Sequence, residues 1–460
     1  MKERFDLVVL GAGSAARDAA GKAKREHDAN VAIVERERWG GSCPNVACRP
    51  TKAYLTAAEL VHDVNTEAAN RGIAVSRAEI DLSRLRTWKD SIRRDQASWV
   101  EVLGEQYEAV SGEAEFVDRE TVRVDGRELS AERILIATGG RTAVPPIPGL
   151  ADVDWLDHIS ALELERVPES LLVVGAGPVG LEFAQIFARF GSHVTIVNHG
   201  TQIAARADTE AAVELMAALA DEGIEVILTS GGVEQFTTRN GTLIEAAITG
   251  GRVLTVSHVL LAGGRVANIE ALGLDAIGVD ASTRGIVVDE HQRTNVDGIW
   301  AAGDAAVGPL LTPTAQYQAR IAVDDMFGNE RAADYSILPT AIFTDPELGS
   351  VGLTEAEARA GGFDLEVVKH PLAYVTRAQF STSKRGLYKI VFDRATRKVL
   401  GVHVVSRGAS DIVGTLALAM RLGLTVDDMA MVHHVYPSYS EGLKAAAEQA
   451  SAARGQTLRV

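Results

Sequence analysis

Two cysteines, Cys43 and Cys48, have the residue type and spacing that most directly suggest chemistry. They are the only cysteines among 460 residues, and four residues separate them within WGGSCPNVACRPTK, Trp39 to Lys52. Structural thiols are expected to scatter through a core, and two thiolates without a nearby histidine or further cysteine make an incomplete metal site. The spacing therefore favours a redox pair, and we predict no metal site.

The surroundings of the pair fit redox chemistry. Gly40 and Gly41 permit a turn into a helix start, where free N–H groups stabilise a thiolate. Because an i, i+5 pair in a regular helix does not meet disulfide geometry, we expect the first turn to be distorted.

An internal repeat supplies two further candidate sites. Each copy reads strand, G-x-G-x-x-G/A, helix, strand. The small residues of the two copies are Gly11, Gly13 and Ala16, and Gly175, Gly177 and Gly180. The first glycine permits a tight turn, the second lets a pyrophosphate approach the backbone, and the third position must be small for the helix to pack on the strand. Two copies with matching flanks predict two dinucleotide-binding units rather than incidental glycine turns.

The copies differ at the end of their second strand. In the first copy, Glu35 directly follows the expected strand Val31 to Val34. A carboxylate at this place accepts hydrogen bonds from a ribose diol. Asn198 holds that place in the second copy, with His199 and Arg206 nearby. A missing carboxylate removes repulsion against a 2′-phosphate and tilts the second site toward NADPH. Alternatively, Asn198 bonds a plain ribose and His199 is only a loop residue.

Further motifs identify a resemblance. The cysteine segment resembles the G-G-x-C-x-N-x-G-C-x-P-x-K signature of the flavin-dependent pyridine nucleotide–disulfide oxidoreductases, which include dihydrolipoamide dehydrogenase, glutathione reductase and mercuric reductase. Other signatures follow in order over nearly the whole chain: ATGG at Ala137 to Gly140, GAGPVGLEFA at Gly175 to Ala184, TNVDGIWAAGD at Thr294 to Asp304 and FTDPELGSVGLTE at Phe343 to Glu355. Ala47 and Arg49 depart from the usual residues of the cysteine motif.

The resemblance implies roles for individual residues. Cys48 would lie against the flavin, Cys43 would be the more exposed thiol that meets the substrate, and Lys52 would reach the flavin and pair with Glu182. The first glycine unit, Glu35 and Asp304 would bind FAD, and the second unit would bind NAD(P)H. The remaining motif residues expected at the cofactors are Gly41, Ser42, Thr138, Gly139 and Gly264.

The same resemblance predicts the fold class and domain order. We expect an α/β protein with two Rossmann-like dinucleotide-binding domains and a C-terminal α+β dimerisation domain. The FAD domain would span residues 1–151 and 265–334, the NAD(P) domain 152–264 and the interface domain 335–460. A homodimer with a shared active site follows from the resemblance.

The C-terminal segment HHVYPSYSEGLK departs from thiol-handling relatives. Those relatives place a histidine base before the proline and a glutamate four residues after it. Pro437 and Glu441 match, but Tyr436 replaces the histidine, and a phenol with a pKa of about 10 is a poor base at neutral pH. His434 is a substitute base or an ordinary surface or core histidine. Tyr436 also matches the active-site tyrosine of mercuric reductases, whose C-terminal cysteine pair this sequence lacks.

Composition bounds the remaining functions. A net charge of −16 argues against nucleic-acid partners, and no apolar run is long enough to span a membrane. A cysteine content this low does not suit a secreted disulfide scaffold, and we expect a cytoplasmic enzyme. Its predicted activity passes electrons from NAD(P)H through FAD to Cys43 and Cys48, and on to a small disulfide, metal ion or oxidant. The alternatives are a quinone or other electron-acceptor oxidoreductase, and dihydrolipoamide dehydrogenase.

Overall fold

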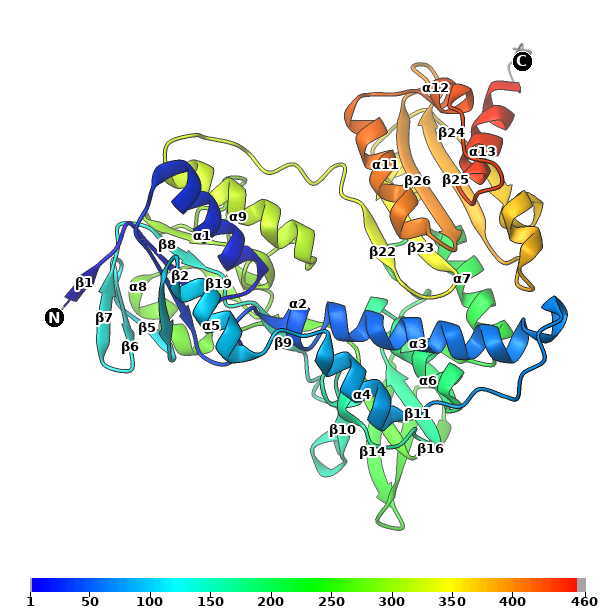
Figure 1. Ribbon diagram of the computed structural model, residues 1–460, viewed down its shortest axis with the longest axis horizontal. Coiled ribbons are helices and arrows are strands. Elements are labelled where there is room, and N and C mark those ends of the chain that lie inside the picture. The colour runs from blue at the N-terminus through cyan, green and yellow to red at the C-terminus, as the bar shows by residue number, and fades with distance from the viewer. Residues whose placement is uncertain (1, 453–460) are drawn as a thin grey trace. The chain divides into compact units, whose positions relative to one another are not determined.

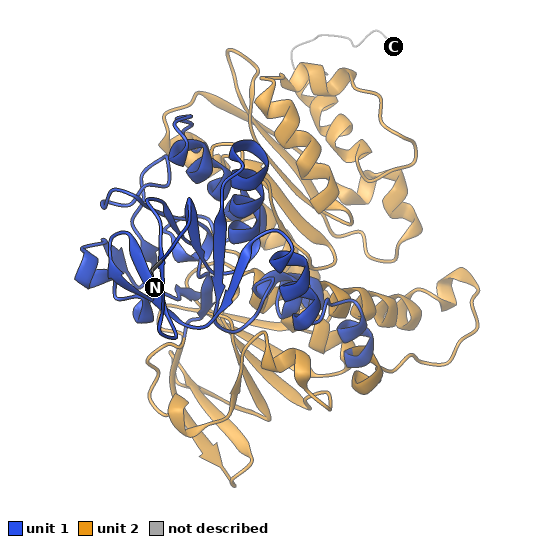
Figure 2. Cartoon of the chain, turned by 60° about the vertical axis from the view of Figure 1, so that its left-hand side comes forward, with its two compact units in different colours: residues 1–51, 86–143, 264–334 blue, residues 52–85, 144–263, 335–460 orange. Residues whose placement is uncertain are grey.

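The computed structural model describes residues 2–452, and the chain divides into two compact units. The first comprises residues 1–51, 86–143 and 264–334, and the second residues 52–85, 144–263 and 335–460 (Figure 2). The second unit thus takes in both the region of the second glycine motif and the C-terminal region. It also includes residues 52–85 and 144–151, which the sequence analysis assigned to the first domain.

A parallel sheet forms the centre of the first unit (Figure 1). Its strands, in spatial order, are β21 (Ile299–Ala301), β8 (Ile134–Ile136), β2 (Leu7–Leu10), β3 (Val31–Glu35) and β4 (Glu108–Ser111). All four residues of β2 are buried, as expected for a continuous apolar run covered on both faces. Helices α1 (Ser14–His27) and α9 (Thr312–Met326) pack against each other in this unit.

A smaller antiparallel layer completes the first unit. It pairs β5 (Ala114–Asp118), β6 (Thr121–Val124) and β7 (Arg127–Ser130), and β1 (Lys2–Arg4) adds to β7 in parallel. The short strands β9 (Gly140–Thr142) and β18 (Arg265–Ala267) pair antiparallel, which brings the second and third segments of the unit together.

The second unit contains a parallel sheet of the same kind around the second glycine motif. Its spatial order is β10 (Trp155–Leu156), β17 (His258–Leu261), β11 (Ser170–Val174), β12 (His193–His199) and β13 (Glu225–Thr229). Helices α6 (Pro178–Phe190) and α7 (Thr209–Asp221) follow β11 and β12. An antiparallel sheet of β14 (Val233–Arg239), β15 (Leu243–Ile248) and β16 (Arg252–Val256) is inserted before β17.

The C-terminal part of the second unit is an antiparallel sheet with helices. The strands run in the order β22 (Thr340–Ile342), β23 (Glu347–Gly352), β26 (Val399–Ser406), β25 (Leu387–Asp393) and β24 (Leu365–Pro371). Helix α11 (Ala409–Arg421) packs on β23 and β26, and α13 (Glu441–Ala452) packs on β24 and β25. Two parallel sheets and one antiparallel α+β region confirm the predicted fold class.

Candidate active site

The helix is interrupted between the two cysteines, as predicted. Cys43 lies in the single turn α2 (Ser42–Asn45), which ends at Val46 with φ −139° and ψ 0°, and Cys48 is the first residue of the long helix α3 (Cys48–Thr66). The Cys48 Sγ lies 3.6 Å from Oγ1 of Thr312, the first residue of α9. The break therefore removes the regular helical spacing that would keep the two sulfurs apart.

The two thiols differ in exposure in the folded chain. Cys43 is half-buried, and Cys48, the first residue of α3, is exposed. The expectation that Cys43 is the more exposed thiol concerns the enzyme with a flavin against Cys48, and it stays a prediction.

Close backbone packing holds the α2 turn in place. Gly41 has φ +76°, and a Cβ on it would lie 2.4 Å from the Cα of Gly13 in the first glycine motif. The Asn45 side chain donates to the carbonyl oxygens of Trp39 and Gly41 at 2.9 and 2.7 Å. Any larger residue at position 41 would push the cysteine turn away from the glycine loop.

Lys52 and Glu182 form the ion pair that the sequence analysis predicted. The Lys52 Nζ lies 2.7 Å from Glu182 Oε2, and the Glu182 side chain is only 6% exposed. The other carboxylate oxygen accepts the backbone N–H of Phe343 at 3.1 Å, and Lys52 also lies 4.2 Å from the Phe343 ring centroid. Because Lys52 follows Cys48 by one turn of α3, this network fixes a cation on the same helix as the thiol.

The two glycine loops have nearly the same hydrogen bonds. Gly11 and Gly175 both have φ +109°, and their N–H groups donate to the carbonyls of Val34 and Val197 at 2.7 and 2.8 Å. A Cβ on Gly11 would lie 2.3 Å from the Ala137 carbonyl oxygen. The internal repeat is therefore a repeat of backbone geometry as well as of sequence.

A pocket lies beside the first glycine loop. Gly11, Glu35 and Thr138 line it, together with Asn268 from the third segment of the unit. The Thr138 Oγ1 is buried without a hydrogen-bond partner. These residues fit the prediction that the first glycine unit and Glu35 bind the ADP part of FAD, which stays a prediction.

Other residues predicted at the cofactors also lie in the first unit. Gly139 and Gly264 have positive φ angles, and a Cβ on either would meet no atom within 4 Å. Ser42 is exposed at the start of α2, and Ala16 is fully buried in α1. Asp304 pairs with the Arg265 guanidinium at 2.8 Å, a partner that the sequence analysis missed.

The second loop leaves open space at its middle glycine. A Cβ on Gly177 would meet no atom within 4 Å, whereas a Cβ on Gly180 would lie 2.0 Å from the Gly175 carbonyl oxygen. The middle glycine can therefore admit a ligand while the third is required for packing. His199, the last residue of β12, and Arg206, which follows that strand, are both exposed.

The C-terminal candidates His434 and Glu441 make separate hydrogen bonds. His434 Nδ1 lies 3.0 Å from Ser440 Oγ, while Glu441 accepts the backbone N–H of Ser438 at 2.8 Å. Burial, and then Lys444, lower the pKa of His434 against an opposing effect of Glu441. Tyr436 is 72% exposed. Within the described residues, the hydrogen bond of Glu441 serves the helix start rather than His434.

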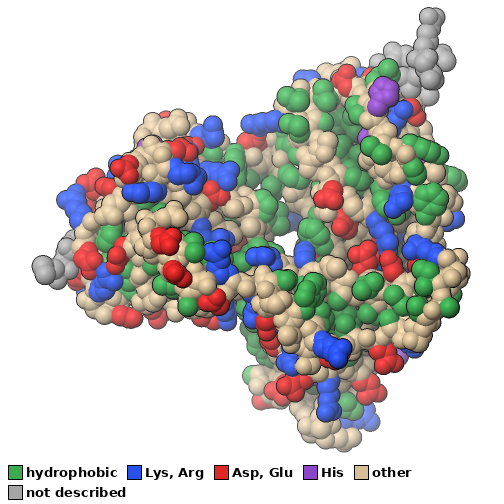
Figure 3. All heavy atoms as spheres, in the orientation of Figure 1, with side chains coloured by type: hydrophobic (Ala, Val, Ile, Leu, Met, Phe, Trp, Pro, Cys, Tyr) green, Lys and Arg blue, Asp and Glu red, His purple; other side chains and the backbone are tan. Residues whose placement is uncertain are grey.

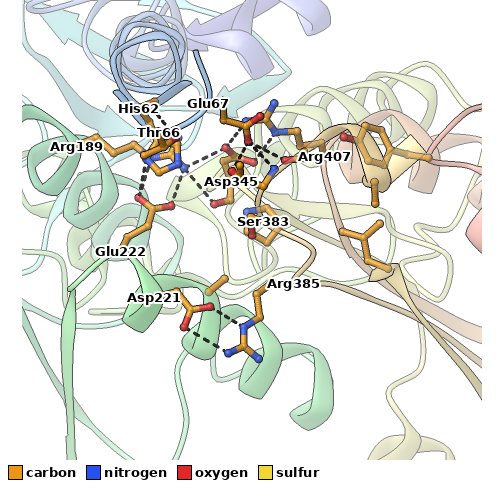
Figure 4. A pocket seen from close by; sticks show the side chains of 17 residues that line it. His62, Thr66, Glu67, Arg189, Asp221, Glu222, Asp345, Ser383, Arg385 and Arg407 are labelled. Carbon is orange, nitrogen blue, oxygen red and sulfur yellow. Dashed lines mark hydrogen bonds and ion pairs between the residues drawn. The ribbon is translucent and has the colours of Figure 1, made fainter. Parts of the chain in front are cut away.

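A polar cavity of about 230 Å³ lies within the second unit, apart from any residue predicted to act (Figure 4). Arg189 on α6 pairs with Glu222 at 2.7 Å and with Asp345 at 3.0 Å. Arg407 pairs with Asp63 and Asp345 at 2.8 and 2.9 Å. These mutual ion pairs indicate a structural charge network.

Sequence reasoning also missed Arg17, which lies one turn into α1 and donates its N–H to Gly13, the residue on which Gly41 of the cysteine turn packs. A useful signal was present, because Arg17 and Asp18 are the two charged residues within SAARDAAG, whose other residues are all small. The neighbours Trp99 and Arg94 come from a segment about 50 residues past the cysteines and carried no motif.

Comparison with known proteins identifies the family. The model of the pyridine nucleotide-disulphide oxidoreductases matches residues 5–319, and that of their dimerisation domain matches residues 338–447. The chain belongs to this family. It is accordingly an FAD-dependent pyridine nucleotide–disulfide oxidoreductase, and the dimerisation domain implies a homodimer.

Several relatives cover nearly the full chain. The mercuric reductase of Streptomyces lividans is 37% identical over 96% of both chains, and the dihydrolipoyl dehydrogenase of Thermus scotoductus is 36% identical over 96% of this chain and 97% of its own. The solved structure of the HOCl-induced flavoprotein disulfide reductase RclA from Escherichia coli has a TM-score of 0.86 at 29% identity, covering 96% of this chain and 99% of that one.

The surface of this oxidoreductase agrees with association through its C-terminal region. Figure 3 shows hydrophobic side chains gathered over that region. The exposed large hydrophobic residues there include Leu418, Leu422, Met431, Val432 and Val435. Within residues 2–452, no helix has the length and apolar character needed to cross a membrane.

Proposed function

We propose that the enzyme uses Cys43 and Cys48 as a redox disulfide that passes electrons from NAD(P)H to a small disulfide, a metal ion or an oxidant. The observation that carries the proposal is the interrupted helix, which sets Cys43 in its own turn and Cys48 at the first residue of α3. Lys52, one turn later and paired with buried Glu182, supplies a fixed positive charge on the same helix. FAD, when bound, accepts two electrons from the nicotinamide and delivers them to the disulfide.

The reaction with a disulfide substrate balances as two exchange steps. The Cys43 thiolate attacks one substrate sulfur, the substrate S–S bond breaks, and the leaving thiolate takes up a proton. The Cys48 thiolate then attacks Cys43 Sγ, forms the Cys43–Cys48 bond and releases the second substrate thiol. Two electrons leave the dithiol and reduce the substrate to two thiols.

The substrate class follows the chemistry of relatives and the C-terminal departure. The relative at 37% identity is named mercuric reductase, and one solved structure of RclA is a Cu(II) complex. Tyr436 in place of a histidine base argues against dihydrolipoamide as the preferred substrate, because a phenol does not accept a proton readily at neutral pH. We therefore place metal ions, oxidants and small disulfides ahead of dihydrolipoamide.

NADPH is the favoured nicotinamide. Asn198 brings no negative charge to the second site, and the exposed side chains of His199 and Arg206 are available to a 2′-phosphate. Arginine is the usual partner of that phosphate in this type of site.

Reductive titration tests the central proposal. Anaerobic wild-type holoenzyme should accept about two equivalents of NADPH per FAD, because flavin and disulfide each store two electrons. Cys43→Ser and Cys48→Ser should accept about one equivalent and lose disulfide reduction. A wild-type capacity equal to that of the variants would exclude the redox disulfide.

The alternative of direct quinone reduction gives the opposite result in the same variants. Electron transfer from flavin to a quinone does not need the sulfurs, so Cys43→Ser would keep it. If Cys43→Ser still reduces quinones but no longer reduces disulfides, metal ions or oxidants, the two activities are separate.

A further inference from the structure

An uncompensated arginine lies next to the turn that carries Cys43. Arg17 is half-buried one turn into α1, and its Nε is buried without a hydrogen-bond partner. Its terminal nitrogen reaches only the neutral Ser14 hydroxyl, at 3.5 Å. Among residues 2–452, no carboxylate makes an ion pair with it.

Two other buried arginines of the protein form ion pairs with carboxylates. Arg189 and Arg397, with side chains 3% and 6% exposed, pair with Glu222 and Asp427 at 2.7 Å. The carboxylate next to Arg17 in sequence, Asp18, is instead engaged by Arg320 at 2.9 Å. Burying part of a guanidinium without an anion is costly, and no described carboxylate offsets that cost by pairing with Arg17.

Trp99 supports the guanidinium from one side. The Arg17 Cζ lies 4.7 Å from the Trp99 ring centroid, and the Arg94 Cζ lies 5.0 Å from it. The indole ring is only 9% exposed, and a Cβ on Gly40 would lie 2.5 Å from it. The aromatic face holds the cation in position without neutralising its charge.

The same elements flank Cys43. Gly40 packs on Trp99 and Gly41 packs on Gly13, whose carbonyl accepts the N–H of Arg17 at 3.0 Å. Arg93, which precedes helix α5 (Gln96–Gly104), and Gln96, the first residue of that helix, both hydrogen-bond Asn45 at the end of the α2 turn. Burial lowers the pKa of Arg17, and the nearby Cys43 is the strongest group opposing that effect.

We propose that Arg17 makes the surroundings of Cys43 a recognition site for oxidised substrates that carry a negative group, such as a carboxylate or sulfonate next to the disulfide. The inference rests on the proposed function in taking Cys43 as the thiol that attacks the substrate. Arg17 supplies the charge, Trp99 positions it, and the missing carboxylate partner leaves that charge available to a ligand. The anion arrives with the substrate and leaves with the product thiol.

Alkylation by a charged and a neutral reagent tests the proposal without knowledge of the substrate. The anaerobic holoenzyme is reduced with NADPH and treated at one pH with iodoacetate or iodoacetamide, and labelling of the Cys43 peptide is followed by mass spectrometry. Both reagents consume the same thiolate, so their rate ratio reports the local charge rather than the thiol pKa. The ratio of the iodoacetate rate to the iodoacetamide rate should be higher for wild-type Cys43 than for a small free thiol. Arg17→Met should lower this ratio about fivefold.

Matched variants identify the source of the charge. Arg17→Lys keeps the cation and should keep most of the ratio. Arg94→Met, which removes an exposed guanidinium from the same tryptophan, should change the ratio less than about twofold, since solvent and salt screen it. A ratio in Arg17→Met equal to that of the wild type, at equal FAD content, overturns the proposal.

Two further measurements cover the remaining outcomes. If Arg17→Met does not fold, raising the salt concentration should lower the wild-type ratio toward that of the free thiol, and a salt-independent ratio overturns the proposal. Labelling of Cys43 before any NADPH is added would contradict the redox disulfide. The ratio of the iodoacetate and iodoacetamide rates would still measure the effect of Arg17 in that case.

A pair of disulfides then tests recognition directly. Dithiodiglycolate carries two carboxylates, and hydroxyethyl disulfide is a neutral compound of similar size. The kcat/KM ratio of the first to the second should fall about fivefold in Arg17→Met, mainly through KM. Equal losses with both substrates would indicate a structural role and reject the recognition site.

Discussion

The Asn198 side chain accepts the backbone N–H of Ala176 at 3.0 Å, the same contact that Glu35 makes with Ala12 at 2.9 Å in the other half of the repeat. The asparagine thus keeps the structural hydrogen bond of a carboxylate without its charge. Its Nδ2 also donates to the Gln202 carbonyl at 3.0 Å, which no carboxylate can do.

This pairing predicts the outcome of a cofactor-specificity variant. Asn198→Asp preserves the acceptor for Ala176 and adds a negative charge where a 2′-phosphate would bind. The kcat/KM ratio of NADPH to NADH should fall about tenfold. Asn198→Ser, which adds no charge, serves as the control. A wild-type enzyme that already strongly prefers NADH would contradict the assignment.

Tyr436 provides a second prediction. Tyr436→His restores an imidazole before Pro437, with an ordinary pKa of about 6.5, and should raise the rate of dithiol oxidation about tenfold at neutral pH. Tyr436→Phe separates the new base from loss of the phenol, and stopped-flow measurement of the dithiol half-reaction checks both. No increase in the histidine variant would mean that another group, with His434 the nearest candidate, already accepts the proton.

A buried ion pair in the second unit predicts a stability effect. The side chains of Lys389 on β25 and Asp208 before α7 are each 2% exposed and lie 2.9 Å apart. Lys389→Met leaves a buried carboxylate and should lower the free energy of unfolding by about 3 kcal/mol. Lys369→Met removes a lysine that is 48% exposed and bound to Glu210, and should cost less than about 1 kcal/mol. Equal losses by chemical denaturation would refute this difference.

His403 predicts loss of stability in mild acid. Burial, with a smaller effect of Lys389, lowers its pKa against opposing effects of Asp208, Glu357 and the Leu353 carbonyl. The folded protein therefore binds fewer protons than the unfolded chain below about pH 6.5, so stability is full above that pH and falls as pH drops through the lowered pKa.

The matching experiment compares pH 7.5 with pH 5.5. His403 Nε2 lies 3.1 Å from the Leu353 carbonyl, which accepts hydrogen bonds only, and His403→Gln offers an amide donor in its place. The wild-type free energy of unfolding should fall by on the order of 1 kcal/mol more than that of the variant. Parallel pH profiles would assign the acid sensitivity to other groups.

The parts of the site that sequence could predict are those held by local backbone geometry. The glycine loops and the interrupted turn between Cys43 and Cys48 lie in motifs whose spacing dictates their shape. The pairing of Lys52 with Glu182, 130 positions away, was predicted from the family resemblance instead. The Lys389–Asp208 pair joins residues 181 positions apart without a motif, so only the folded chain reveals it. The exposure of Cys48 depends on what covers a helix start, which residue type does not determine.

Helix α1 begins at the glycine loop of the FAD domain and presents Arg17 one turn later. Deletion of one residue within that turn would rotate the arginine by about 100° around the helix axis, and it would also disturb the glycine loop. Substrate preference can therefore evolve here by substitution of residue 17, but not by insertions or deletions in this turn. Libraries that vary residue 17 alone should yield altered preferences far more often than libraries that vary the length of this segment.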